Sequence, residues 1–505
     1  MTGTYLLLLI ALTSAASLVP ALRNKAYDWV LVNAGFLVAA AAGYLVAPER
    51  AGAWLVAPYV VFAIAPLVAV AQLNRMLAAR KNGAARVLAR IAYVLHPSRG
   101  HRRLIRLNDA FLLASDGKVE EAATILREAG HGQDMDLEML RLENRWTDII
   151  AYIEAATDKP LEHGAAVLYV RALGETGQLD RLIEAYFDLT ERWAKRDDMS
   201  DEVASVRLFV AAFLGQPALV EEMCAGPLRH FNPSIKQYWV ALAHAAGGDR
   251  ARATAMFEEL QHDDEARIRA AARFHLEQPP VRVEQLGDNL RALVDDLARA
   301  IRDVATYAPP PAQRPWLSYG IVGALVIVHS ILAWQQRSDP MAFYTFGVFW
   351  SPAVLDDGEW WRLVAAMFLH ASWLHLAMNV LGLLWFGPFV ERFIGRVRFG
   401  LIYVAGGIGG FAVLAAIVAL GWRDTTLALG ASGAVMALIG ASTGIFLRAS
   451  ARSPVAAKRL RDMLTFVGIQ VVFDILAPRV SMTAHVAGLV IGFGFGLLMK
   501  PRAVR

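Results

Sequence analysis

Long uncharged stretches divide this 505-residue chain into three parts. Near the N-terminus, Asp, Glu, Lys and Arg are absent from residues 1–22, 29–48 and 51–74. After a charge-rich middle region, the same absence returns in residues 316–336, 363–390, 399–422, 425–447 and 480–499. A helix of about 20 residues covers the roughly 30 Å hydrocarbon layer of a membrane. With a shorter run at 463–478 that contains Asp474, the pattern predicts three membrane spans, a soluble region and six further spans.

These runs predict four segments along the chain. They are three transmembrane helices at 1–74, a cytoplasmic helical domain at 75–307, a linker at 308–315 and a six-helix core at 316–500. The linker is predicted from the sequence PPPAQRP, because closely spaced prolines cannot continue a helix.

The overall composition agrees with a membrane protein. Hydrophobic residues make up 56% of the chain, charged residues only 19%, and the mean hydropathy is +0.39. This balance excludes a disordered protein and predicts an all-α polytopic membrane protein. The single cysteine, Cys224, excludes an intramolecular disulfide and a cysteine-based zinc site, and no H-E-x-x-H motif occurs. We therefore expect no metal, no cofactor and no nucleic-acid partner.

The positive charges predict the orientation of the chain. Nine Lys or Arg residues fall between Arg75 and Arg106, and loops rich in such residues stay in the cytoplasm. With nine spans, the N-terminus lies outside and the C-terminus inside, as expected for a bacterial inner membrane. A cleaved signal peptide is the alternative for the first span, but its basic residues follow the apolar run instead of preceding it.

The soluble middle carries a loose helical repeat. Turn sequences at Gly117, Asn144, Gly177, Gly215 and Gly248 are 27, 33, 38 and 33 residues apart. This spacing is similar to the 34-residue period of tetratricopeptide repeats, which bind protein partners. A plain helical bundle is the alternative, and either fold offers a surface for a cytoplasmic protein.

A polar side chain inside a membrane span costs free energy, so we interpret it as functional unless a structural contact explains it. Ser432 lies in Gly430-Ala431-Ser432-Gly433, which lacks the last glycine of the soluble-hydrolase motif G-x-S-x-G. Taken alone, this serine is more typical of close helix packing. Seven residues of helix would place it about 10 Å below the outer surface.

His485 lies in the last span within Ala484-His485-x-x-Gly488-x-x-x-Gly492. The glycines form a small-residue stripe that lets a neighbouring helix approach closely. The alternative is a structural histidine whose ring is hydrogen-bonded within the core, but such a histidine needs a partner from another helix.

A third polar cluster lies in the second span of the core. His375 and Asn379 are four residues apart on one helix face and, without a carboxylate beside them, suit an oxyanion better than a metal. For Asp474 in the fifth span, we expect an interhelical hydrogen bond or an extension towards the outer interface.

Together these elements resemble the rhomboid family of intramembrane serine proteases. The resemblance covers residues 316–500 and rests on six spans, Glu359-Trp360-Trp361-Arg362, the pattern H-x-x-x-x-H-x-x-x-N from His370, G-x-S-G and A-H-x-x-G-x-x-x-G. It implies that Ser432 is the nucleophile and His485 its general base, in a dyad without an acid. It further implies an oxyanion hole made of the Ser432 N–H, His375 and Asn379.

The resemblance also assigns structural positions. It implies structural roles for Trp361 and Arg362 in the first loop, and we expect Gly430, Gly433, Gly488 and Gly492 to be structural as well. One departure is Met436, which stands where the family often has an aromatic residue that stacks on the base. A thioether packs against an imidazole edge, so a softer constraint on His485 is expected.

The leading hypothesis is thus a protease that cleaves transmembrane substrates near the outer face. The alternative is a non-proteolytic scaffold that binds transmembrane helices and cytoplasmic proteins. The presence of both serine and histidine favours the enzyme. A transporter would require an inverted repeat with broken helices, which the sequence does not show.

Overall fold

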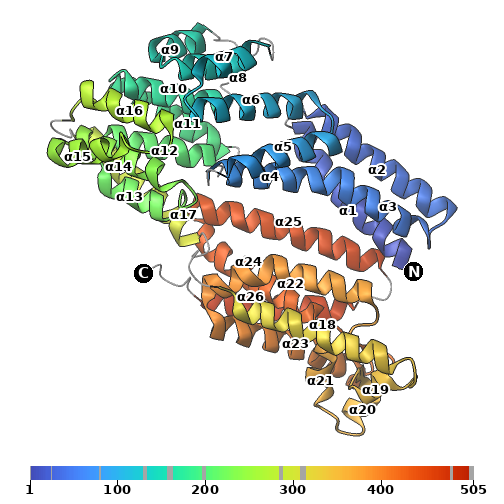
Figure 1. Cartoon of the computed structure of the whole chain (residues 1–505). Coiled ribbons are helices and arrows are strands. Elements are labelled where there is room, and N and C mark those ends of the chain that lie inside the picture. Colours follow the sequence, from blue (N-terminus) through green and yellow to red (C-terminus); the bar gives the residue numbers. More distant parts are fainter. Residues whose placement is uncertain are drawn as a thin grey trace. The chain divides into compact units, whose positions relative to one another are not determined.

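The computed structural model is almost entirely helical (Figure 1). It describes residues 2–23, 26–78, 81–128, 133–155, 163–195, 201–283, 288–307, 314–477 and 481–499. Most of the predicted linker, residues 308–313, and the basic C-terminal residues 500–505 lie outside the described residues. The chain is an all-α polytopic membrane protein, as the uncharged runs predict.

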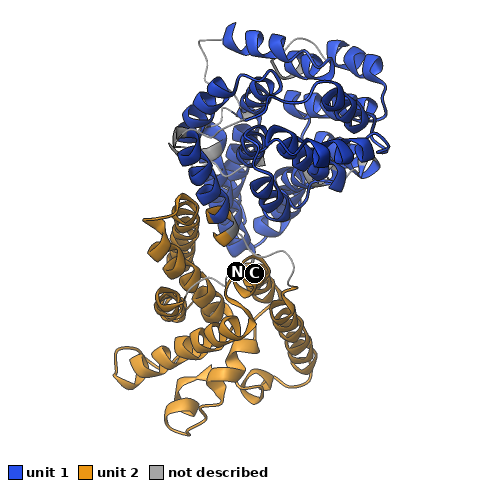
Figure 2. Ribbon diagram, turned by 90° about the vertical axis from the view of Figure 1, so that its left-hand side faces the viewer, with its two compact units in different colours: residues 1, 3–302 blue, residues 2, 303–505 orange. Residues whose placement is uncertain are grey.

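The chain forms two compact units, and the boundary between Arg302 and Asp303 falls inside one helix (Figure 2). Apart from Thr2, the first unit holds the N-terminal apolar helices together with the helical domain, and the second holds the six-helix core. The division into four segments stays a prediction.

The first unit begins with three apolar segments. They are α1 (Thr2–Arg23), α2 (Tyr27–Val46), and a third that runs through α3 (Ala51–Tyr59), the π-helical turn η1 (Val60–Ile64) and α4 (Ala65–Ala78). Pro58 precedes the π-helical turn, and a proline inside a helix removes one backbone hydrogen bond and forces such an adjustment. The third predicted span is therefore one helical segment with a local irregularity.

The predicted turns of the soluble region join consecutive helices. Gly117, Asn144, Gly177, Gly215 and Gly248 all have positive φ angles, between 53° and 90°, which reverse the chain at a helix end. The helices are α5 (Asn82–Leu95), α6 (Arg99–Ser115), α7 (Val119–Glu128), α8 (Gln133–Leu142), α9 (Trp146–Ala155), α10 (His163–Glu175), α11 (Leu179–Lys195), α12 (Asp201–Phe213), α13 (Pro217–Ala225), α14 (Pro233–Ala246), α15 (Arg250–Leu260), α16 (Ala266–Glu277) and α17 (Asp288–Tyr307). The helix pairs agree with a repeat, while the likeness to tetratricopeptide repeats stays a prediction.

The second unit contains six long helices, and one of them, α24, lies at the centre. They are α18 (Trp316–Gln335), α22 (Trp373–Ile394), α23 (Arg396–Ala419), α24 (Ser432–Ser450), α25 (Pro454–Leu476) and α26 (Met482–Leu498). The α24 helix packs against α22, α23, α25 and α26. In α24, 78% of the most apolar stretch is buried, against 11–44% for the other candidate spans. Its small residues allow this central position, because backbones approach closely where side chains are small.

The described chain contains six helical stretches long and apolar enough to cross a membrane. They are Tyr27–Val46, Ala51–Leu73, Trp316–Gln335, Trp373–Ile394, Arg396–Ala419 and Ser432–Ser450. Two further apolar helices, Gly3–Val19 and Met482–Leu498, are shorter, and the predicted run 463–478 belongs to the longer, partly charged α25. All nine predicted runs therefore contain helix. For the runs 1–22, 463–478 and 480–499, a membrane span stays a prediction.

Two predicted spans of the core are wrong in their first residues. The run 363–390 contains a short helix α21 (Arg362–Ala365), a 3-10 turn (Ala366–Phe368) and a non-helical break before α22 begins at Trp373. The run 425–447 starts with strand β2 (Leu427–Ala428), and its helix begins only at Ser432. The depth of about 10 Å expected for Ser432 assumed helical rise over residues that are not helical.

The segment between α18 and α22 is tied to the segment before α24. It contains α19 (Ala342–Thr345), strand β1 (Phe349–Trp350) and α20 (Ser351–Leu355). Strand β1 pairs antiparallel with β2, so that Phe349 lies opposite Ala428. The backbone N–H of Gly430 also donates to the carbonyl of Ala366 at 2.9 Å.

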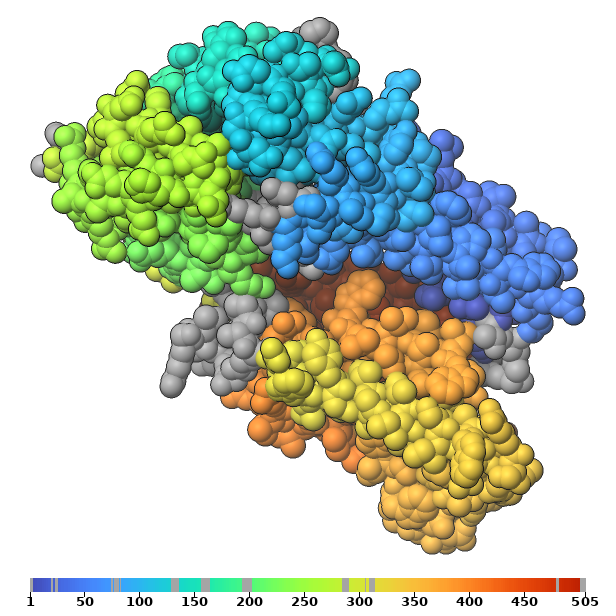
Figure 3. All heavy atoms as spheres, viewed as in Figure 1, coloured from blue at the N-terminus to red at the C-terminus, as the bar shows by residue number. Residues whose placement is uncertain are grey.

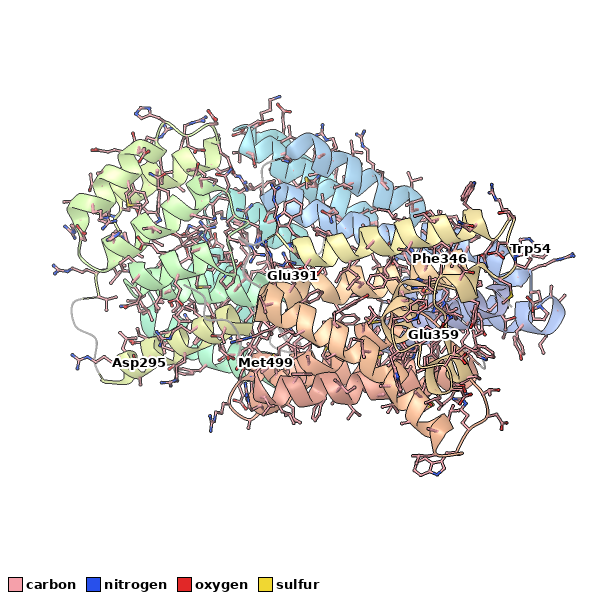
Figure 4. The ribbon with its side chains drawn as sticks, turned by 90° about the horizontal axis from the view of Figure 1, so that it is seen from below. Trp54, Asp295, Phe346, Glu359, Glu391 and Met499 are labelled. Carbon is pink, nitrogen blue, oxygen red and sulfur yellow. The ribbon has the colours of Figure 1, made fainter. Side chains whose placement is uncertain are left out.

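A buried carboxylate holds the start of α18 at one end of the core. Glu359 and Phe346 lie at one end of the unit, and Glu391 and Met499 at the other (Figure 4). The buried Glu391 carboxylate accepts hydrogen bonds from the backbone N–H groups of Leu317 (3.1 Å) and Ser318 (2.7 Å). These are free N–H groups at the start of α18, and a carboxylate there stabilises the helix.

The α18 helix lies along one face of the second unit (Figure 3). Its outward side chains include Ile327 and Trp334, which are 60% and 66% exposed. Large apolar side chains exposed along a whole helix are expected where lipid, not water, surrounds the protein.

Candidate active site

Ser432 is the first residue of the central helix α24. The preceding Gly430 has a φ of 123°, a conformation that side-chain-bearing residues rarely adopt, and it turns the chain sharply into the helix. The first recorded hydrogen bond of this helix runs from the Val435 N–H to the Ala431 carbonyl at 3.0 Å. The amides of Ser432, Gly433 and Ala434 thus point out of the helix end, where a developing negative charge is stabilised.

Gly430 keeps the space beside Ser432 open. A Cβ atom on Gly430 would lie 3.0 Å from Nε2 of His375 and 3.9 Å from Oγ of Ser432. The His375 ring and the Ser432 hydroxyl therefore border the same small space, as the implied oxyanion hole requires. Any side chain at position 430 would fill it.

The environment of His375 fixes which ring nitrogen carries the proton. Ser372 caps α22 by accepting a hydrogen bond from the His375 N–H at 3.2 Å, and the Ala371 N–H donates to His375 Nδ1 at 3.4 Å. A backbone N–H can only donate, so Nδ1 accepts and the neutral ring carries its proton on Nε2. This N–H is the nitrogen that borders the space beside Ser432.

Asn379 lies one turn further along α22 and is 6% exposed. Its side-chain amide donates to the His375 carbonyl at 3.0 Å, and an amide nitrogen carries a second N–H. The prediction that His375 and Asn379 share a helix face is confirmed.

His485 is held by a carboxylate from the neighbouring helix. Its Nδ1 lies 2.7 Å from Oδ2 of Asp474 on α25, and the side chains are 8% and 2% exposed. The side-chain amide of Gln470 donates to the other carboxylate oxygen, Oδ1, at 2.7 Å. The interhelical hydrogen bond predicted for Asp474 is confirmed, whereas its extension to the outer interface is wrong because the residue is buried.

The glycine stripe of α26 places its backbone directly against α24. A Cβ atom on Gly488 would lie 2.1 Å from the carbonyl oxygen of Gly433, and Gly492 meets the Ala437 carbonyl in the same way. Gly433 itself has more room, with its nearest neighbour at 3.4 Å. The close helix approach predicted from the small residues is confirmed, and it holds the helix of His485 next to the first turn after Ser432.

Ser432 itself is half-buried. Within the part of the chain that the structure describes, no hydrogen bond to the Ser432 hydroxyl is recorded. Catalytic hydrogen bonds are often long before substrate binds and tighten in the reacting complex.

The buried Arg362 side chain binds the backbone of the segment between α18 and α22, which is the first loop of the core. Only 2% of it is exposed, and its guanidinium donates to the carbonyls of Tyr344 (2.8 Å) and Val348 (3.2 Å) and pairs with Glu359. It also lies over the rings of Tyr344 and Trp361, at 4.2 and 4.8 Å from their centroids. These contacts hold the segment in place, and the structural role that the resemblance implies for Trp361 and Arg362 stays a prediction.

Two further histidines surround His375. His370 and His329 are 0% and 3% exposed. The His370 ring lies 5.1 Å from that of His375 and 6.2 Å from that of His329. His329 carries no recognisable signal in the sequence, because it is a lone histidine in an apolar run. In the described residues, no group of three His, Cys, Asp or Glu side chains is arranged to hold a metal ion.

The fold and the site define a polytopic helical protein with a serine at the start of a buried helix. Residues 357–502 match the model of the Rhomboid domain family. A putative rhomboid protease of Bacillus subtilis, YdcA, is 30% identical over 177 residues, which are 35% of this chain and 81% of that protein. The chain therefore belongs to the rhomboid family.

Other relatives match over a smaller share of their length. RHOMBOID-like protein 6, mitochondrial, of Arabidopsis thaliana is 36% identical over 30% of this chain and 48% of its own length. Rhomboid protease GluP of Bacillus subtilis is 33% identical over 28% of this chain and 26% of its own length. The chain spans about half the length of several of the curated relatives it matches.

Proposed function

We propose that this protein is an intramembrane serine endopeptidase in which Ser432 attacks the peptide bond and His485 acts as general base. The observation that carries the proposal is the hydrogen bond from His485 Nδ1 to Asp474. An ionised carboxylate only accepts hydrogen bonds, so the proton of the neutral ring is on Nδ1 and Nε2 keeps a lone pair for the serine proton.

The chemistry follows the acyl-transfer pattern of serine hydrolases. Ser432 Oγ bonds to the scissile carbonyl carbon while its proton moves to His485 Nε2. The oxygen that becomes negative takes hydrogen bonds from the Ser432 N–H, His375 Nε2–H and Asn379. His485 then gives the proton to the leaving amine, and water, activated by the same imidazole, releases the acyl group.

The proposed substrates are transmembrane helices cut near the outer face. Ser432 and His485 both stand in the first turns of their helices, and water has to reach them from that end. The proposed orientation places this end outside, with the N-terminus outside and the C-terminus in the cytoplasm, in a bacterial inner membrane.

The helical domain at 75–307 is proposed to lie in the cytoplasm and to recruit a protein partner or a substrate. Its paired helices support an interaction surface. The alternative function is a scaffold without proteolysis, in which the same core binds transmembrane helices.

The proposal is tested with purified full-length protein and a model transmembrane substrate. Ser432→Ala and His485→Ala should each abolish cleavage, and the double variant should be no worse than either, because members of one catalytic unit are not additive. Ser442→Ala is the matched control, since this buried serine of the same helix donates to the Leu438 carbonyl of its own helix at 2.9 Å. Activity retained by Ser432→Ala would favour the scaffold.

A further inference from the structure

We propose that Asp474 is a positioning residue that holds the His485 imidazole in the reactive tautomer, so that the site works as an acid–base–nucleophile series instead of a dyad. This inference rests on the proposed function of Ser432 and His485. It departs from the expectation of a dyad without an acid.

The geometry is that of a direct, buried, charge-assisted hydrogen bond. Asp474 Oδ2 lies 2.7 Å from His485 Nδ1, within the range of short N–H···O bonds to carboxylates. Both side chains are at least nine-tenths buried, at 2% and 8% exposed. Electrostatic interactions are stronger in such surroundings than in water.

Gln470 shows that the carboxylate is oriented and not merely adjacent. It lies one turn before Asp474 on α25 and donates to Oδ1 at 2.7 Å, which leaves Oδ2 for the histidine. Each carboxylate oxygen therefore has its own donor, and the rotation of the carboxylate is fixed. A buried carboxylate without such partners would be strongly unfavourable in a membrane.

The arrangement has a direct consequence for the proton transfer. The Ser432 proton moves to His485 Nε2, the Nδ1–H stays on the ring, and Asp474 remains a carboxylate throughout. The imidazolium formed in this step faces the negative charge, which stabilises it. Without the carboxylate, the neutral ring is free to carry its proton on Nε2, where it cannot accept the serine proton.

A purely structural tie between α25 and α26 is the competing explanation. It predicts that replacing Asp474 lowers stability, while any folded variant keeps its turnover. The two explanations are separated by Asp474→Asn, which keeps the shape of the side chain but presents an amide to Nδ1.

The experiment compares kcat and KM for cleavage of a model transmembrane substrate by the full chain in detergent. For Asp474→Asn we expect kcat to fall by a factor of about 100 to 10,000, the upper figure being the known effect of this substitution in a soluble serine protease, with KM changed less than about twofold. Asp474→Glu should recover part of kcat. Asp462→Asn is the control, because this acid of the same helix pairs with Lys458 and is 47% exposed.

A second measurement does not depend on turnover. The ¹⁵N signals of His485, assigned by their loss in His485→Gln, should report a proton on Nδ1 in the wild type and a changed tautomer in Asp474→Asn. A wild-type ring protonated on Nε2 overturns the inference, and so does a wild-type kcat in folded Asp474→Asn. If Ser432→Ala is inactive while Asp474→Asn matches the wild type, only this inference fails. If Ser432→Ala cleaves normally, the proposed function fails.

Discussion

Replacing Gly488 with alanine adds one methyl group at the point where α26 lies against α24. Its Cβ atom would stand 2.1 Å from the Gly433 carbonyl oxygen, whereas 3.4 Å is the lower limit of an ordinary contact. The two backbones must therefore separate by about 1 Å, because a carbonyl within a helix cannot rotate away as a flexible side chain does.

The size of the effect follows from where this separation occurs. Gly433 directly follows Ser432, and Gly488 lies three residues after His485, so the displacement opens the distance between the proposed nucleophile and the proposed base. A misplacement of about 1 Å costs on the order of a hundredfold in rate, and overpacking costs about 1–3 kcal/mol of stability. We expect Gly488→Ala to lower kcat about a hundredfold and the unfolding temperature measurably, and Gly488→Leu to fold worse than Ser432→Ala.

The assay is cleavage of a model transmembrane substrate by purified protein, together with thermal unfolding in the same detergent. Gly494→Ala is the matched control, because a Cβ atom on this glycine of the same helix meets no atom within 4 Å. Wild-type cleavage and stability in Gly488→Ala would refute the close-packing argument, and equal losses in Gly494→Ala would point to a general effect on the helix.

Two further predictions concern the oxyanion hole and the orientation. Asn379→Ala and His375→Ala should each lower turnover about a hundredfold with near-normal expression, since one lost oxyanion donor costs about 3 kcal/mol; normal rates in both would leave these residues a packing role. An impermeant maleimide on intact cells should label a cysteine at the exposed Asp356 but reach one at the exposed Ala451 only after permeabilisation. The background should be low because burial raises the pKa of the Cys224 thiol to about 11. Labelling of Ala451→Cys in intact cells would reverse the orientation and put cleavage on the cytoplasmic side.

The sequence alone predicts the helical class and the number of apolar runs, because an uncharged stretch of about 20 residues is typical of a helix that crosses the hydrocarbon layer of a membrane. It also predicts the five turns of the helical domain, since glycine and asparagine tolerate the positive φ that such reversals need. It does not locate the starts of α22 and α24. Apolar residues continue through both breaks. At the first break, Ser372 caps the start of α22 by accepting a hydrogen bond from the His375 N–H. At the second, the Gly430 N–H donates to the Ala366 carbonyl, which is distant in sequence.

The candidate site shows the same division between local and long-range information. Ser432, His485, His375 and Asn379 are recognisable from local motifs and polarity. The partner of His485 is not, because Asp474 lies on another helix and a single acid in a span is compatible with several contacts. Gln470 carried no signal at all. With Met436 in place of an aromatic residue the sequence predicts a softly held histidine, whereas the structure holds the ring through Nδ1.

The pairing of β1 with β2 connects the segment between α18 and α22 to the backbone that leads into the proposed active site. Phe349 and Trp350 lie opposite Ala428 and Leu427, and the Ser351 N–H donates to the Thr426 carbonyl at 3.0 Å. A shift of this strand is transmitted to Gly430 within a few residues. Loop residues some 80 positions before the serine are thus sites where substitutions can adjust the proposed oxyanion hole without changing its proposed donors. Positions 349–351 and 426–428 should accordingly change together, not singly, among functional variants.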